Sequence, residues 1–201
     1  MNTRTDSPHA RKAGPIHAIS TCLVLSLIAF FINKFFYTES LFSTLRGGES
    51  LPLQFIVGAL IGLVYAFFSV SIFAVGGRYV GWLGQVWSQM LGLLDKVDLS
   101  GLNFIWFALC AGIGEELLFR GALQPIIGMW WSSIIFMLIH SWTGELSSMN
   151  WKKWVYVATT FVASVVLSYT YIYFGLIAAI VAHTTIDIVA MLVMRKSRSA
   201  A

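Results

Sequence analysis

The sequence predicts an all-α protein: a polytopic transmembrane helical bundle of about six spans, with an interfacial helix near residues 79–99. Of the 201 residues, 58% are hydrophobic and only 11% are charged, whereas an average soluble domain carries roughly a quarter charged residues. Long apolar runs recur along the chain, and a membrane crossing needs about 20 such residues. Eight Trp, seven Tyr and fifteen Phe supply the aromatic rings that gather at membrane interfaces.

Six apolar runs follow one another, and glycine or polar residues separate them. We expect spans at about residues 16–36, 53–75, 101–127, from 130 past 140, 152–173 and 176–194. The run at 16–36 exceeds the roughly 7–15 apolar residues of a signal peptide, so we interpret it as a span. Residues 79–99 carry apolar side chains at helical spacing, which indicates a helix in the interface or a packed connector.

Basic residues gather at both ends of the chain. Three precede the first span and three follow the last: Arg4, Arg11, Lys12, Arg195, Lys196 and Arg198. We expect a disordered basic N-terminus at 1–15, one membrane-embedded domain at 16–195 and a basic C-terminal tail at 196–201. An even number of spans places both termini on one side, which the positive-inside rule identifies as cytoplasmic. Lys152 and Lys153 then lie on that side too.

The two cysteines, Cys22 and Cys110, lie inside apolar runs. We interpret them as small buried hydrophobic residues rather than as a disulfide.

A cluster of six ionisable residues lies within the third, fourth and sixth predicted spans, where a charge at the bilayer centre costs about 2.5–3.5 kcal/mol even on the mildest scale. They are Glu115, Glu116, Arg120, His140, His183 and Asp187. Counted from the turns at Gly128 and Gly175 at 1.5 Å per residue, they lie at similar depths. Such residues face a bundle interior and are functional candidates by default.

Helical spacing suggests a role for each pair. Glu116 and Arg120 are four residues apart, in the favourable order for an ion pair, so Glu115 on another face stays available for chemistry. His183 and Asp187 are also four apart, so the carboxyl group is placed to orient the imidazole. A carboxylate beside a histidine can take a proton from water and return it to a leaving amine. Taken alone, the ion pair also suits a structural role, and each histidine suits helix packing.

Three motifs in order resemble one known family. Glu115-Glu116-Leu-Leu-Phe-Arg120 matches E-E-x-x-x-R, Phe136-Met-Leu-Ile-His140 matches F-x-x-x-H, and His183-Thr-Thr-Ile-Asp187 matches H-x-x-x-[N/D]. Over roughly residues 100–195 the chain resembles the CPBP intramembrane proteases, which include the type II CAAX prenyl endopeptidases. The first two spans match only in hydrophobicity.

The resemblance implies a glutamate-type hydrolase that needs no metal and no cofactor. Glu115 and His140 would activate water, while His183 and the residue at 187 would form the oxyanion hole. Asp187 departs from the Asn of the best-studied CAAX enzymes. An amide donates a hydrogen bond at any pH, whereas Asp donates only when protonated, so an orienting role toward His183 stays open.

Two alternatives remain from the residues themselves. Glu115, His140 and His183 could bind Zn²⁺, since three N/O ligands and water make a catalytic site, although no H-E-x-x-H is present. A buried acid–histidine chain also suits a proton-coupled or peptide-binding membrane protein. We expect two partners: the lipid bilayer, and a protein or peptide substrate with or without a lipid group or membrane anchor. We expect no nucleic acid. The expected location is a bacterial or archaeal cell membrane.

Overall fold

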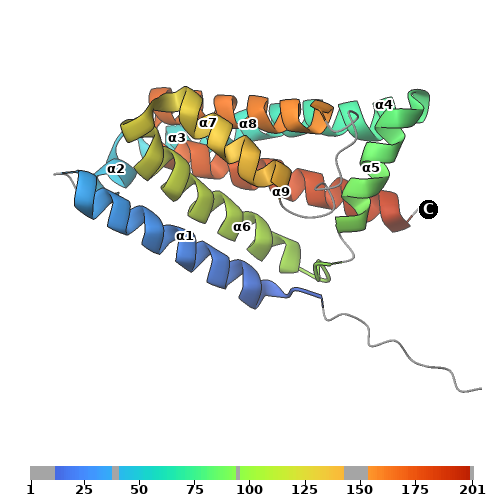
Figure 1. Ribbon diagram of the computed structural model, residues 1–201, viewed down its shortest axis with the longest axis horizontal. Coiled ribbons are helices and arrows are strands. Elements are labelled where there is room, and N and C mark those ends of the chain that lie inside the picture. The colour runs from blue at the N-terminus through green and yellow to red at the C-terminus, as the bar shows by residue number, and fades with distance from the viewer. Residues whose placement is uncertain (1–11, 38–40, 94–95, 143–153, 200–201) are drawn as a thin grey trace, which may run out of the picture.

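The computed structural model describes residues 12–37, 41–93, 96–142 and 154–199. These residues form helices joined by short connections, and no strand occurs in the part of the chain that is described (Figure 1). The elements are α1 (Pro15–Phe36), α2 (Leu41–Arg46), α3 (Leu51–Val70), the π-helix η1 (Ser71–Val75), α4 (Gly76–Tyr79), α5 (Gly81–Leu93), α6 (Asn103–Glu116), the π-helix η2 (Leu117–Leu123), α7 (Gln124–Trp142), α8 (Trp154–Phe174) and α9 (Leu176–Ser199). The predicted all-α membrane bundle is confirmed.

Five helical stretches are long and apolar enough to cross a membrane: Pro15–Phe36, Leu51–Tyr79, Asn103–Ser141, Trp154–Phe174 and Leu176–Ser199. The third stretch reverses at Gly128, whose φ of 81° and ψ of 163° are not helical. Glu115 and His140 demonstrate the reversal, since 25 residues of straight helix would separate them by roughly 37 Å, yet their side chains lie 3.3 Å apart. The two arms on either side of Gly128 correspond to the predicted third and fourth spans.

The outward faces of the long helices are apolar, as lipid requires. Leu60, Val64 and Phe67 on α3 are among many large hydrophobic side chains that stay exposed. The buried set is instead rich in small and polar residues, including Ser132 and Ser168. Apolar burial gives little driving force between helices in lipid, so close packing and internal hydrogen bonds must hold the bundle together.

Helices α3 and α9 run in the same direction and make the most extensive contact between any two elements (Figure 1). The contact depends on glycine. A Cβ at Gly58 would lie 2.5 Å from the carbonyl oxygen of Ala178, and one at Gly62 would lie 2.5 Å from that of Ala182. This is the small-xxx-small pattern that lets two membrane helices approach closely. The close approach matters for function because α9 carries His183 and Asp187.

Helix α5 lies within the predicted 79–99 segment and crosses the end of the bundle near the C-terminus of α9 (Figure 1). Ala13 exchanges backbone hydrogen bonds with Lys96 and Asp98 at 2.8 and 2.9 Å, so residues 12–14 are held against the connector after α5. The rest of the N-terminal segment, including Arg4 and Arg11, lies outside the described residues, as do Lys152 and Lys153. Helix α9 continues to Ser199, past the predicted end of the sixth span.

Cys22 and Cys110 are both free and partly buried. They lie on neighbouring helices, α1 and α6. No disulfide links these two cysteines.

Candidate active site

A carboxylate and two imidazoles from three helices meet inside the bundle. Glu115 lies near the end of α6, His140 near the end of α7 and His183 within α9. The Nε2 atom of His140 is 3.3 Å from Oε2 of Glu115, and Nε2 of His183 is 3.8 Å from the same oxygen. The Glu115 side chain is 18% exposed, so the meeting point is nearly closed.

A fully buried ion pair lies beside this group. Arg120 donates from Nη1 to Oε1 of Glu116 at 2.7 Å, and neither side chain has any exposed surface. Its Nη2 donates to the carbonyl oxygen and to Oγ of Ser164 on α8, at 2.9 and 2.8 Å. A buried charge is tolerated only with such partners. The pair predicted from the four-residue spacing is therefore present, and Ser164 is a partner that the sequence did not indicate.

Glu116 also orients His183. Nδ1 of His183 lies 2.7 Å from Oε1 of Glu116, the same oxygen that accepts from Arg120. A carboxylate only accepts hydrogen bonds, so Nδ1 carries the proton. The four-residue spacing had suggested Asp187 as the residue that orients the His183 imidazole. Its Oδ2 instead lies 3.7 Å from Nε2, at the other end of the ring. That distance is too long for a hydrogen bond. The Nδ1 partner of His183 is thus Glu116 rather than Asp187.

The backbone of α7 and a phenyl ring position His140. Nδ1 of His140 lies 2.9 Å from the carbonyl oxygen of Phe136, and a carbonyl oxygen can only accept, so Nδ1 is the donor. The Phe136 ring stacks on the imidazole, with centroids 4.1 Å apart and planes inclined by 21°. The same ring meets His183 edge-on at 6.0 Å and lies beneath the Arg120 guanidinium. Phe136 therefore packs against three of the six predicted site residues.

The hydrogen bonds at both Nδ1 atoms determine what the site can do. A neutral imidazole has one N–H, so when neutral each histidine presents a lone pair at Nε2. Both Nε2 atoms face Oε2 of Glu115, which also accepts. One added proton can be shared between Glu115 and His140 across their 3.3 Å contact. The group is therefore arranged to exchange a proton between a carboxylate and an imidazole.

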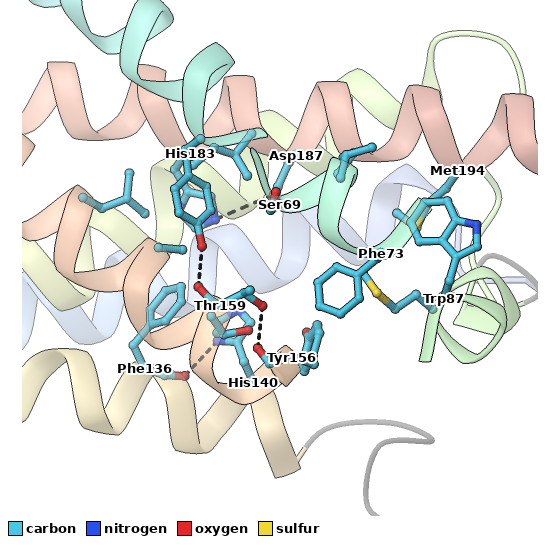
Figure 2. A pocket seen from close by; sticks show the side chains of 18 residues that line it. Ser69, Phe73, Trp87, Phe136, His140, Tyr156, Thr159, His183, Asp187 and Met194 are labelled. Atoms are coloured by element: carbon cyan, nitrogen blue, oxygen red, sulfur yellow. Dashed lines mark hydrogen bonds and ion pairs between the residues drawn. The ribbon is translucent and has the colours of Figure 1, made fainter. Parts of the chain in front are cut away.

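A cavity of about 250 Å³ opens beside the group (Figure 2). His140, His183 and Asp187 line it at one end, and Asp187 is 25% exposed. Phe73, Trp87 and Met194 gather at the other end, away from the histidines (Figure 2). Ionisable side chains thus line one end of the cavity, and apolar side chains line the other.

Several residues that line the cavity were not indicated by the sequence. Tyr65 on α3 donates a hydrogen bond to the carbonyl oxygen of Thr159 on α8, and this bond ties the two walls together. Tyr156 on α8 and Trp87 on α5 also line it. The apolar spacing of 79–99 predicted the helix that carries Trp87, and that spacing was the only signal in the sequence for this wall of the cavity.

The comparisons with known proteins point to one family. Residues 98–189 match the family model described as type II CAAX prenyl endopeptidase Rce1-like. The matched segment contains all six ionisable residues, and it confirms the resemblance drawn from the three motifs. A search of curated proteins and a search of solved structures found no match. The family is one of membrane proteases, and the apolar helices indicate a multi-pass membrane protein.

Proposed function

We propose that this protein is an intramembrane endopeptidase, since its residues 98–189 match the family model described as type II CAAX prenyl endopeptidase Rce1-like. In this proposal Glu115 and His140 activate a water molecule that hydrolyses a peptide bond, and no metal takes part. The observation that carries the proposal is the 3.3 Å contact between Glu115 and His140 beside a cavity. A carboxylate and an imidazole that share a proton form a general acid–base pair.

In the proposed reaction, water enters the cavity beside His140 and gives a proton to the Glu115–His140 pair as its oxygen attacks the carbonyl carbon of the substrate. The carbonyl π electrons move to the oxygen, which becomes an oxyanion. When the tetrahedral intermediate collapses, the C–N bond breaks and the pair returns its proton to the amine nitrogen. No covalent link to the protein forms in this scheme.

His183 and Asp187 are proposed to stabilise the oxyanion. With Nδ1 committed to Glu116, His183 can donate from Nε2 only as an imidazolium. Asp187 can donate only as the carboxylic acid. Both residues line the cavity beside Glu115, which supports a role in stabilising the charge that develops there. Glu116 and Arg120 position His183 and do not touch the substrate.

The proposed substrate is a membrane-associated protein or peptide, with or without a lipid group. The scissile bond would lie at the histidine end of the cavity, and an apolar part of the substrate would lie toward Trp87 and Met194. We also propose that both termini are cytoplasmic and that the membrane is that of a bacterial or archaeal cell.

The test compares the membrane proteomes of cells that carry the wild-type protein and the Glu115→Gln variant. The amide keeps the size of Glu115 but cannot take a proton, so turnover should fall by roughly 10²–10⁴-fold. We expect at least one membrane-associated precursor to accumulate uncleaved. His140→Ala should give the same precursor.

Glu49→Gln serves as the matched control, since Glu49 is exposed in the connection before α3 and does not line the cavity. Its proteome should equal that of the wild type. Normal processing in the Glu115→Gln strain would refute the proposal. So would purified wild-type protein that binds the precursor and never cleaves it.

A zinc-dependent hydrolase is the second candidate, and one observation favours it. Histidines that ligate metals usually donate their other ring N–H to a carbonyl or carboxylate, as His140 and His183 do. Within the described residues, no group of three or more His, Cys, Asp or Glu side chains is arranged to hold a metal ion. Cleavage that a chelator abolishes and added Zn²⁺ restores would support zinc, whereas cleavage unchanged by the chelator would exclude it.

A further inference from the structure

A second groove lies on the opposite side of the α3–α9 pair from the candidate active site. It has a volume of about 660 Å³. On α9 its lining residues Val189 and Val193 alternate with Asp187, Ala190 and Met194, which line the active-site cavity. The groove and the active-site cavity therefore lie on different faces of α9, and Val70 at the end of α3 lines both.

Most of the groove wall is apolar and faces the region where lipid would lie. The α3 side consists of Leu63, Phe67 and Val70, and the wall continues onto η1. From Leu63 to Arg78 the helix rises by roughly 22 Å. One leaflet makes up half of a hydrocarbon core that is roughly 30 Å thick. The wall is longer than that half, so an extended acyl chain can lie along it.

The charged side chains of the groove lie toward one end. Arg78 on α4 and Lys196 on α9 both line it there, and Ser197 lies next to Lys196. No acidic residue lines the groove. Among the ion pairs of the described residues, neither Arg78 nor Lys196 takes part. Two cations at the end of an apolar channel complement a ligand that is anionic at one end and apolar along the rest.

We propose that this groove binds one anionic phospholipid, with its phosphate between Arg78 and Lys196 and an acyl chain along α3 and α9. Arg suits the phosphate because its planar donors can bind two oxygens at once. Both cations lie at the ends of membrane-spanning helices, the depth of a lipid headgroup. A free phosphate would satisfy the cations but leave the apolar wall without a ligand.

The test measures lipid binding by native mass spectrometry of the purified full-length protein in detergent. The probes are dioleoylphosphatidylglycerol and dioleoylphosphatidylcholine. We expect one molecule of the anionic lipid to bind in preference to the neutral one. One cation near a membrane surface changes the affinity for an anionic lipid by about five-fold. Arg78→Gln and Lys196→Gln should therefore each weaken phosphatidylglycerol binding about five-fold, and leave phosphatidylcholine unchanged.

Arg198→Gln is the matched control, because Arg198 lies on the last turns of α9 but lines a different pocket. It makes the same change in net charge, so an equal loss with this variant would show a general basic surface and overturn the site. Val193→Trp should fill the groove and weaken both lipids. Binding of glycerol phosphate as tight as that of phosphatidylglycerol would also overturn the proposal, because the acyl chain would then contribute nothing. Thermal unfolding confirms that each variant is folded.

Discussion

At the residue scale, the two histidines of the site differ in what holds them. His140 is tied to its own helix through the Phe136 carbonyl oxygen, whereas His183 is tied to another helix through Glu116. The Glu116 carboxylate in turn accepts from Arg120, which reaches Ser164 on α8. The hydrogen bond at Nδ1 thus ties His183 to α6, and through Arg120 to α8, whereas the one at Nδ1 of His140 stays within α7.

Asp187 offers a prediction of pH dependence. As an oxyanion donor it works only when protonated, so loss of its proton should lower wild-type activity as pH rises. Asp187→Asn donates at any pH and should shift this loss of activity to higher pH, where deprotonation of His183, the other proposed donor, becomes the limit. Rates of cleavage measured across a pH series check this. The charged or titratable groups that share the surroundings are His183, His140, Glu115 and Tyr156.

The control for that series is Asp98→Asn, outside the membrane-spanning segments. Hydrogen bonds from Ser100 hold the pKa of Asp98 below its ordinary value, with a smaller contribution from Asn103. Asp98 does not line the cavity, so its replacement should not move the profile. An Asp187→Asn profile that superimposes on the wild type, or an enzyme inactive at every pH, would contradict the donor role.

Sequence reasoning found the six ionisable residues because each is conspicuous in an apolar span. It assigned partners only at a spacing of four, since that is the spacing a single helix makes visible. That rule identified Glu116–Arg120 correctly and placed Asp187 near His183. It could not reveal Glu116–His183 or Arg120–Ser164, which lie 67 and 44 positions apart. Contacts between helices depend on rotation and tilt, which one sequence does not encode in a readable pattern.

At the element scale, glycines set how closely α3 approaches α9. Gly62 has the tighter surroundings, since an added Cβ would lie 2.5 Å from a carbonyl oxygen and 2.7 Å from Cβ of Thr185. Neither atom can move without shifting α9. This part of α9 directly precedes Asp187 and includes the turn that carries His183.

We expect Gly62→Ala to destabilise the protein by about 1–3 kcal/mol through overpacking, and to lower activity with it. Thermal unfolding in detergent measures the change. Gly81→Ala is the matched control, because nothing lies within 4 Å of an added Cβ there. It should be neutral or slightly stabilising, since alanine favours helix. A Gly62→Ala variant as stable as Gly81→Ala would show that the two helices are free to separate.

The helical segments themselves were largely predictable, because a 20-residue apolar run has few alternatives in a membrane. The π-helices η1 and η2 were not. They follow Val70 and Glu116 within runs that read as continuous α-helix, and a π segment differs from an α-helix by one residue of register. The apolar composition of a run does not distinguish a π segment from an α-helix. Such segments often occur at functional sites, and η2 supplies Arg120.

At the scale of the whole molecule, the parallel course of α3 and α9 fixes which ends share a side. Gly48 and Gly175 pack together at one end. Arg195 reaches the Gly101 carbonyl oxygen at the other, where Ala13 also pairs with the connector. Both described ends of the chain therefore lie at the same end of the bundle.

This arrangement predicts the labelling of single cysteines introduced after Cys22 and Cys110 are replaced by Ala. Lys12→Cys and Ser199→Cys should react with a membrane-impermeant maleimide from one side only, and Ser50→Cys from the opposite side. All three positions are exposed. In intact cells the proposed orientation leaves positions 12 and 199 protected and position 50 reactive. Labelling of positions 12 and 199 from opposite sides would disprove the arrangement.

The reversal of the chain at Gly128 limits the insertions that the protein can tolerate between Glu115 and His140. Glu115 lies 13 residues before it and His140 lies 12 after it, so the two arms are nearly equal in length. One inserted residue in either arm would turn its side chain by about 100° and shift it by 1.5 Å along the axis. Most loops tolerate a one-residue insertion, but here the insertion would point the side chain of Glu115 or His140 toward lipid. The number of residues between Glu115 and His140 should therefore be as constrained as their identities.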